Sequence, residues 1–185
     1  MASPHLDRLA ALLPVPPTPI EAPTETAWGE LEERVAIELP SDYRKFLGLY
    51  GSGVIDQFLW VLNPFTSNEN ARFPEASDRQ LGILRWIREQ GTETLPYPLY
   101  PEAGGLLLWA ESANGDCFYW ITSEGSPENW PVTVNEARAD NWHDHAGPMT
   151  ALLARRRPSR SSDRPAVQPT AQAGSPITSS KVSVT

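Results

Sequence analysis

The chain has 185 residues and carries 15 Lys and Arg against 23 Asp and Glu, a formal charge of -8. This length fits one medium-sized domain, and the acidic balance argues against a protein that coats nucleic acid. The charge is unevenly spread, because residues 155–185 have a net charge of +5 and residues 1–154 a net charge of -13. All 17 aromatic residues lie between Trp28 and Trp142. We therefore expect an acidic folded domain, residues 26–154, followed by a disordered basic tail, residues 155–185.

Cys117 is the only cysteine, which excludes an intramolecular disulfide and a zinc site built from several cysteines. It lies in an aromatic run, where a thiol usually acts as a small apolar filler. The apolar run at residues 9–13 is shorter than the core of a signal peptide, and no segment approaches the length of a membrane span. These features predict a soluble, cytoplasmic protein with no membrane association.

Residues 1–25 are expected to form a lead-in of two parts. Ser3-Pro4 is typical of a helix start, and apolar residues recur at helical spacing from there to Pro14, which predicts a short docking helix. Residues 14–24 contain five prolines, which predicts an extended and semi-rigid connector.

Three helices are predicted in the first half of the domain. Thr26 is a candidate cap for the first, and Ser41 is a candidate cap for the second, which Gly51 ends in a left-handed conformation. The third runs from about Glu75 to Gln90. Each has apolar residues at helical spacing: Trp28, Leu31 and Val35; Tyr43, Phe46, Leu47 and Tyr50; and Leu81, Leu84 and Ile87.

The second half is richer in predicted strands. Residues 106–110 and 117–121 are apolar on both alternating faces, which is typical of central strands covered on both sides. Between them Asn114-Gly115 predicts a tight hairpin turn with two positive φ angles. Shorter strands are expected at 54–55, 58–62 and 130–134, and a final helix at 148–156. Helices that precede a meander of strands favour a single α+β domain with a central, largely antiparallel sheet flanked by helices.

Three segments together resemble a known family. Residues 39–47 (LPSDYRKFL) with residues 50–55 (YGSGVI) are similar to the opening helix-turn-strand signature of the SUKH superfamily, the Smi/Knr-type cell-wall-regulator and toxin-immunity domains. Residues 104–110 (GGLLLWA), followed by residues 114–116 (NGD) and Trp120, resemble the central hairpin of that family. The resemblance extends over roughly residues 28–153. It implies an α+β fold and a binding role, since many bacterial members neutralise a toxin, often a nuclease, and fungal members act as signalling scaffolds.

Catalytic and metal-binding patterns are weak. His143-Asp144-His145, with Asp140 nearby, has the ligand types of a metal site, but solvated loop residues are the commoner reading of such a cluster. Cys117 in a predicted central strand is better explained as inert core than as a nucleophile activated by His143. The sequence has no nucleophile-elbow, phosphate-loop or zinc-protease motif. We therefore expect no catalytic residue, no metal site and no cofactor.

Acidic residues of the strand-rich half are the more informative feature. Most of them are expected to keep the surface solvated, but together they could steer a basic partner and compete with nucleic acid for a cationic site. Glu136 belongs to the same acidic group. The predicted partner-binding residues are Glu111, Asn114, Asp116, Glu124, Glu128, Asp140 and Asp144.

The leading hypothesis is a non-enzymatic domain that binds a protein, as an immunity protein whose acidic surface occludes a toxin, for example one of the nuclease type. The alternative is a regulatory scaffold that recruits partners through residues 14–24 and the basic tail. A lesser alternative is a small metal-dependent hydrolase that uses His143, Asp144 and His145. Direct nucleic-acid binding by the acidic domain is not expected, and the oligomeric state is left open.

Overall fold

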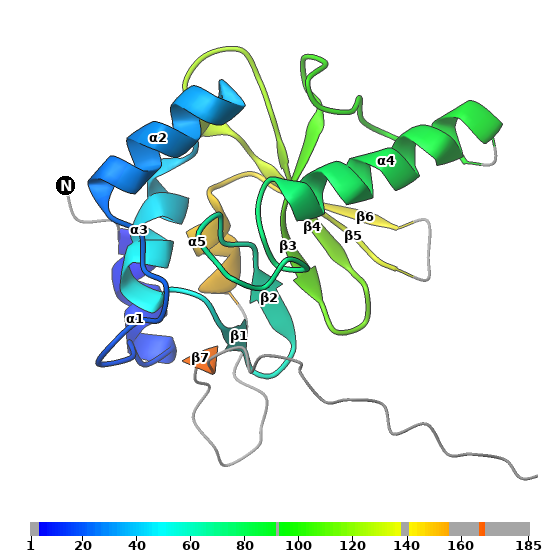
Figure 1. Cartoon of the computed structure of the whole chain (residues 1–185). Helices are drawn as coiled ribbons and strands as arrows, with labels where there is room; N and C mark the ends of the chain where they lie inside the picture. The colour runs from blue at the N-terminus through cyan, green and yellow to red at the C-terminus, as the bar shows by residue number, and fades with distance from the viewer. Residues whose placement is uncertain (1–3, 92, 138–140, 156–166, 169–185) are drawn as a thin grey trace, which may run out of the picture.

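The computed structural model describes residues 4–91, 93–137, 141–155 and 167–168. Within this part of the chain the fold is a seven-stranded antiparallel sheet in the order β6-β5-β4-β3-β2-β1-β7, accompanied by helices (Figure 1). The single α+β domain is confirmed. The helices are α1 (Pro4–Leu12), α2 (Glu25–Val35), α3 (Ser41–Tyr50), α4 (Glu75–Gln90), the short 3-10 helix η1 (Pro127–Asn129) and α5 (Met149–Leu153). The strands are β1 (Val54–Ile55), β2 (Leu59–Val61), β3 (Leu106–Ser112), β4 (Cys117–Ile121), β5 (Val132–Asn135), β6 (Trp142–His145) and β7 (Val167–Gln168).

The sheet is a meander from β1 to β6, because each of these strands pairs with the next one along the chain. In the central hairpin Leu106 lies opposite Ile121 and Glu111 lies opposite Cys117, with a bulge between Leu108 and Ala110. Both strands are almost completely buried, as their apolar character on both faces predicted. The hairpin therefore forms the centre of the core.

Helix α4 covers one face of the sheet, and it is drawn apart from α1, α2 and α3 in Figure 1. The hydroxyl of Ser77 accepts a hydrogen bond from the Leu108 amide beside the bulge at 3.2 Å, and Gln80 donates to the Tyr119 hydroxyl at 3.1 Å. These contacts fix the N-terminal half of α4 to β3 and β4. The buried hydroxyl groups of Ser77 and Tyr119 thus each have a partner, as burial requires.

The other face of the sheet is covered by α3 and the helices around it. Tyr43 of α3 makes an edge-to-face contact with Trp120 and with Trp28 of α2, and its hydroxyl donates to the Leu62 carbonyl at 2.6 Å. Aromatic pairs in this geometry add stabilisation beyond the area that they bury. Helix α5 packs against both α1 and α3, which joins the ends of the domain.

Several predicted boundaries are confirmed and others need correction. Helix α2 begins one residue after Thr24, whose side chain caps it, so the prediction of Thr26 as the cap is wrong. Ser41 is the first residue of α3 and makes no side-chain cap. Gly51 has the expected positive φ, of 63°, but its ψ of -149° lies outside the left-handed helical region, so the predicted left-handed conformation is wrong. Within the predicted hairpin turn only Gly115, at 89°, has a positive φ, so the expectation for Asn114 is wrong.

Strand β6 was not predicted, because its sequence, Trp-His-Asp-His, was interpreted as loop. Trp142 and Asp144 lie on one face of this strand and His143 and His145 on the other; Trp142 is half-buried and His145 is buried, while His143 and Asp144 are exposed. It pairs with β5 over its whole length and forms one edge of the sheet.

The proline-rich segment at residues 14–24 lies against the domain. Ser52 donates its amide to the Ile20 carbonyl at 2.7 Å, and the Tyr50 hydroxyl donates to the Leu13 carbonyl at 2.9 Å. The amide of Ser67 donates to the Glu21 carboxylate at 2.8 Å. The connector is therefore held to the same core as the helices that it joins.

The predicted disordered tail, residues 155–185, lies mostly outside the described residues. Its described part comprises Arg155, which follows α5, and β7, which pairs antiparallel with β1 through Val54 opposite Gln168. The domain boundaries proposed from the sequence remain predictions.

Candidate partner-binding site

Five of the seven predicted partner-binding residues lie at two opposite ends of the sheet. Residues Glu111, Asn114 and Asp116 surround the turn that joins β3 to β4, next to Cys117. Residues Glu124 and Glu128 follow β4 beyond Ile121, at the other end. Asp144 lies within β6 opposite Thr133, and Asp140 lies outside the described residues. The structure therefore divides the acidic residues into two groups, which we describe as the turn end and the cap end of the sheet.

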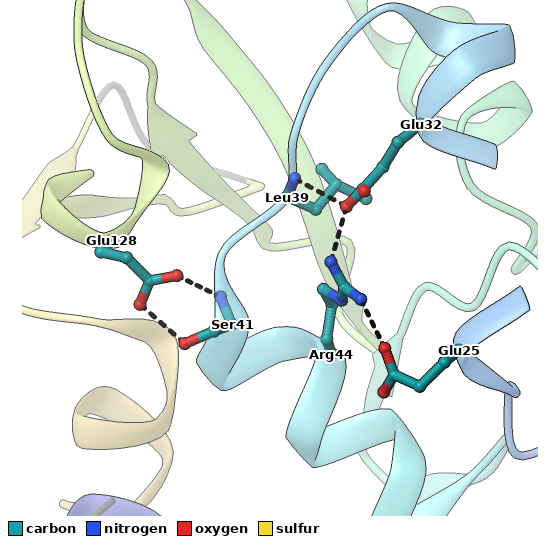
Figure 2. Close-up of polar contacts among 6 residues, drawn as sticks. All are labelled: Glu25, Glu32, Leu39, Ser41, Arg44 and Glu128. Carbon is teal, nitrogen blue, oxygen red and sulfur yellow. Dashed lines mark hydrogen bonds and ion pairs between the residues drawn. The ribbon is translucent and has the colours of Figure 1, made fainter. Parts of the chain in front are cut away.

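Glu128 belongs to the cap end, where it is bonded to the start of α3. Its two carboxylate oxygens accept hydrogen bonds from the amide of Ser41 at 2.7 Å and from the hydroxyl of Ser41 at 2.8 Å (Figure 2). Pro40 at the cap position has no side chain that could accept these bonds. A carboxylate at a helix N-terminus is also favoured by the helix dipole. Glu128 therefore caps a helix that lies 87 residues earlier in the chain.

Asp42, the next residue of α3, is buried beside this contact. Its carboxylate accepts hydrogen bonds from the amide and the hydroxyl of Thr150 at 3.0 and 2.9 Å. Burial raises the pKa of Asp42, whereas the bonds from Thr150 lower it. Ser41, Asp42, Glu128 and Thr150 together join α3, η1 and α5, and we call them the α3 cap. They give the motif Pro-Ser-Asp a structural role.

A second set of ionic contacts joins α2 to α3. Arg44 pairs with Glu25 at 2.9 Å and with Glu32 at 3.1 Å, and Glu32 also accepts a bond from the Leu39 amide at 3.5 Å (Figure 2). The Arg44 guanidinium lies 5.4 Å from the centre of the Trp28 ring. Part of the negative charge of the domain is thus neutralised within it.

Asp144 and Asp116 also have internal partners. Asp144 accepts hydrogen bonds from the Tyr97 hydroxyl at 2.6 Å and from the Thr133 hydroxyl at 2.8 Å. Burial, together with this contact with Asp144, raises the pKa of Tyr97 to about 12. Asp116 accepts from the Ser112 hydroxyl at 2.7 Å and from the Ala137 amide at 3.2 Å. Asp116 thereby holds the β3–β4 turn against the segment that follows β5.

A pocket of about 570 Å³ opens at the turn end, between α4 and the strands β4, β5 and β6. Its size falls in the range of sites that hold small ligands or protruding side chains. The pocket is lined by Gln80, Leu84, Ile87, Glu93, Leu95, Gly115, Cys117, Asn135, Glu136, Ala137 and Trp142.

The pocket combines apolar walls with two exposed carboxylates. Leu84, Ile87 and Trp142 are among the apolar residues, while Glu93 and Glu136 supply the negative charge. Glu136 is bonded to the His143 ring at 3.0 Å through one oxygen. None of the lining residues in the described part of the chain is Lys, Arg or His. The pocket therefore suits a group that is both apolar and cationic.

Exposed apolar side chains lie on α4 beside this pocket. Ile83 is 53% and Trp86 is 58% exposed, which are the highest values among the large apolar residues of the described chain. At 100° per residue Ile83 lies between the pocket-facing Ile87 and Trp86 on the helix surface. Exposed apolar residues next to a pocket are typical of interaction surfaces.

Glu111 and Asn114 complete the turn end. Glu111 is partly buried, and desolvation raises the pKa of its carboxyl, whereas nearby Arg79 lowers it. With Trp60 and Ser112 it lines a second pocket of about 390 Å³. Asn114 and, at the other end, Glu124 are exposed.

The residues considered for catalysis, Cys117, His143 and His145, each lie in a different set of contacts. The Cys117 thiol is buried, and burial raises its pKa to about 12, so a thiolate is not favoured at neutral pH. His143 contacts Glu136, whereas the Nδ1 atom of His145 lies 3.0 Å from Arg155. Within the described ranges, no three of His, Cys, Asp and Glu are grouped so that they could hold a metal ion.

The acidic pattern of the strand-rich half indicated Glu136, but no sequence pattern indicated Glu93, Ile83, Trp86 or Trp142 as surface features. The spacing of α4 places Ile83 and Trp86 away from the core stripe of Leu81 and Leu84, so a helical projection could have found them. Glu93 follows the helix in an irregular segment, and its approach to Trp142 depends on the tertiary fold.

These features define a class of protein, a single α+β domain with an antiparallel meander sheet and an acidic-rimmed pocket at one end. Residues 25–146 match the family model described as SMI1-KNR4 cell-wall, SUKH_6. The match spans more than half of the chain, so the chain belongs to this family, and the SUKH resemblance of its sequence is confirmed. No curated protein and no solved structure matches the chain significantly.

Proposed function

We propose that this chain is a non-enzymatic binding protein that neutralises a cognate bacterial toxin in the cytoplasm. Membership of the SMI1-KNR4 family carries this proposal, because that family is consistent with a toxin-immunity or related binding role. The net charge of -13 over residues 1–154 suits a basic partner, such as a nuclease whose active site is cationic. Within the described residues, no helix is both long and apolar enough to cross a bilayer.

The binding surface that we propose is the turn end of the sheet. There Glu93, Glu136 and Gly115 line one opening, and the exposed side chains of Asn114, Ile83 and Trp86 belong to the turn and the helix that border it. An apolar centre with a charged rim is the usual composition of a protein interface. At the cap end, by contrast, Glu128 is occupied by Ser41.

Neutralisation would proceed by occlusion. The acidic surface attracts a basic partner over a distance of about one Debye length, ~10 Å at moderate salt, and accelerates the encounter. Apolar contacts around Ile83 and Trp86 then desolvate the interface and slow dissociation. A partner that acts on nucleic acid is inhibited because carboxylates occupy the surface that its substrate phosphates would contact.

The proposal is tested by capturing the partner with the full chain from lysate of the source cells after chemical crosslinking, then titrating the isolated partner with the chain. We expect loss of the partner's toxic activity at a ratio of one to one, and association that slows markedly as salt is raised. Capture of a partner whose activity is unchanged by a saturating amount of the chain would overturn immunity. Association that is insensitive to salt would overturn the electrostatic component.

The scaffold alternative receives less support for residues 14–24. This segment is bonded to the domain through the Ile20 carbonyl and the Glu21 carboxylate, and Leu13 just before it is bonded as well, so it is held against the domain. The remaining element of that alternative is the basic tail. Replacing Arg156, Arg157 and Arg160 by Gln should leave toxin neutralisation intact if the folded domain is sufficient, whereas a scaffold would lose recruitment.

A further inference from the structure

The pocket at the turn end offers more than a general acidic surface. Its described lining residues provide two carboxylates, two neutral amides and an aromatic ring, and none of these described residues is basic. Charge complementarity thus selects a cation, and the apolar walls select one with a long aliphatic stem.

We propose that this pocket receives an arginine side chain of the protein partner, an inference that rests on the proposed function and names its anchor residue. Arginine fits better than lysine because its planar guanidinium can bond carboxylates in a bidentate manner and can also stack on an aromatic ring. The methylene stem packs against Leu84, Ile87 and Leu95, while the guanidinium reaches Glu93 and Glu136 at the rim.

Trp142 is held in place to take part in this contact. Its ring packs against Tyr97 with centroids 5.9 Å apart and against Tyr119 at 5.8 Å. Asp144, two residues after Trp142, accepts a hydrogen bond from the Tyr97 hydroxyl at 2.6 Å and so holds Tyr97 in place. A ring supported on its other sides loses little conformational entropy when a cation stacks on it.

Glu136 is placed so that a guanidinium could add to its present contacts. One of its oxygens lies 3.0 Å from the His143 ring, and the other accepts from the Asn141 amide at 3.3 Å. Both contacts are exposed, and a carboxylate has about four lone-pair sites for hydrogen bonds. Glu136 can therefore accept bonds from arginine without leaving a buried donor unpaired.

The test uses the full chain, labelled with nitrogen-15, and N-acetyl-arginine amide as the probe. The side-chain indole N–H of Trp142 reports on the pocket directly, and that of the buried Trp130, which donates to the Ser123 carbonyl at the cap end, serves as a remote control. N-acetyl-citrulline amide has nearly the same shape without the charge. We expect a saturable shift of the Trp142 and Gly115 signals with arginine, a smaller one with the lysine analogue and none with citrulline.

A pair of matched variants separates the pocket from overall charge. Glu93→Gln with Glu136→Gln removes two carboxylates from the pocket, whereas Glu89→Gln with Glu124→Gln removes two exposed carboxylates that do not line it. We expect the first pair to weaken arginine binding about fivefold or more, because it removes two short-range ion pairs. The second pair should change arginine binding less than about twofold. Equal weakening in both pairs, an equal response to citrulline, or an unmoved Trp142 signal would overturn the inference.

Failure of the arginine pocket can also be distinguished from failure of the proposed function. A toxin that is neutralised equally well by the Glu93→Gln, Glu136→Gln variant overturns the arginine pocket and leaves immunity standing. An arginine probe that binds as expected, together with a captured partner whose activity is unaffected, supports the pocket and overturns immunity.

Discussion

At the cap end of the sheet Glu128 spans from η1 to the first residue of α3, whereas at the turn end Glu93 and Glu136 border an open pocket. All three side chains are exposed carboxylates of the same chemical type. Only Glu128 has bonds that replace a missing helix cap, so its charge contributes to the fold. An acidic total therefore does not locate a binding surface, because the hydrogen bonds of each carboxylate decide its role.

The largest effect is expected within the α3 cap, from Asp42→Ala. This change leaves the buried amide and hydroxyl of Thr150 without their acceptor. A buried donor without a partner is costly, so the free energy of unfolding should fall by about 2–3 kcal/mol. Urea unfolding of the full chain measures it. Thr150→Ser keeps the hydroxyl and should lose less, and a loss below about 0.5 kcal/mol in Asp42→Ala would contradict the structural role.

A smaller effect is expected from Glu128→Gln, because the amide oxygen can accept only part of what two carboxylate oxygens accept from Ser41. Unfolding free energy should fall by about 1 kcal/mol, the usual value of a helix cap. The matched control is Glu124→Gln at the same end, which should change stability by no more than about 0.5 kcal/mol. Equal values for the two variants would remove the distinction between the bonded and the exposed carboxylates.

The cap end also contains His145, whose protonation should affect stability. Burial lowers its pKa, and the positive charge of Arg155 and the nearby His5 act in the same direction. The folded state therefore keeps His145 neutral, whereas in the unfolded chain it takes up a proton at its ordinary value of about 6.5. Its contribution is complete above that pH and is lost as the pH falls through 6.5 toward the lower folded value.

Urea unfolding at a series of pH values between about 5 and 7.5 would test this, since that range spans the ordinary histidine pKa. In this range His145→Gln should show a weaker fall in stability with decreasing pH than the original chain. His143→Gln, which alters an exposed histidine of the same strand, is the control. If His145→Gln keeps the original slope, the fall belongs to other groups.

Local patterns in the sequence were sufficient for the elements that bury a regular stripe. The periodicity of Tyr43, Phe46, Leu47 and Tyr50 predicted α3, and the apolar runs around Trp109 and Trp120 predicted the central hairpin. Strand β6 was missed because an edge strand with polar side chains lacks the apolar alternation on which strand prediction depends. Thr24 and Thr26 are equally good caps by composition, and only the backbone distinguishes them.

The candidate site was less accessible to sequence reasoning. The acidic character of the strand-rich half was visible, but the bond between Ser41 and Glu128 joins residues 87 positions apart, and no local signal predicts it. The pocket likewise assembles α4, the segment around Leu95, the β3–β4 turn and Trp142. Such groupings follow from sheet order and helix placement, which the periodicity of single elements does not determine.

The smallest effect on stability is expected at the turn end, and it separates the role of these carboxylates from that of Glu128 most clearly. Glu93→Gln with Glu136→Gln should change the free energy of unfolding by no more than about 0.5 kcal/mol, because both side chains are exposed and Glu136 bonds only exposed groups. The same variant should lose affinity for a basic partner, while Glu128→Gln should lose stability and keep that affinity. Measuring unfolding and partner binding on both variants shows whether each carboxylate contributes to stability or to affinity. A turn-end variant that loses stability as Glu128→Gln does would mean that its carboxylates also support the fold.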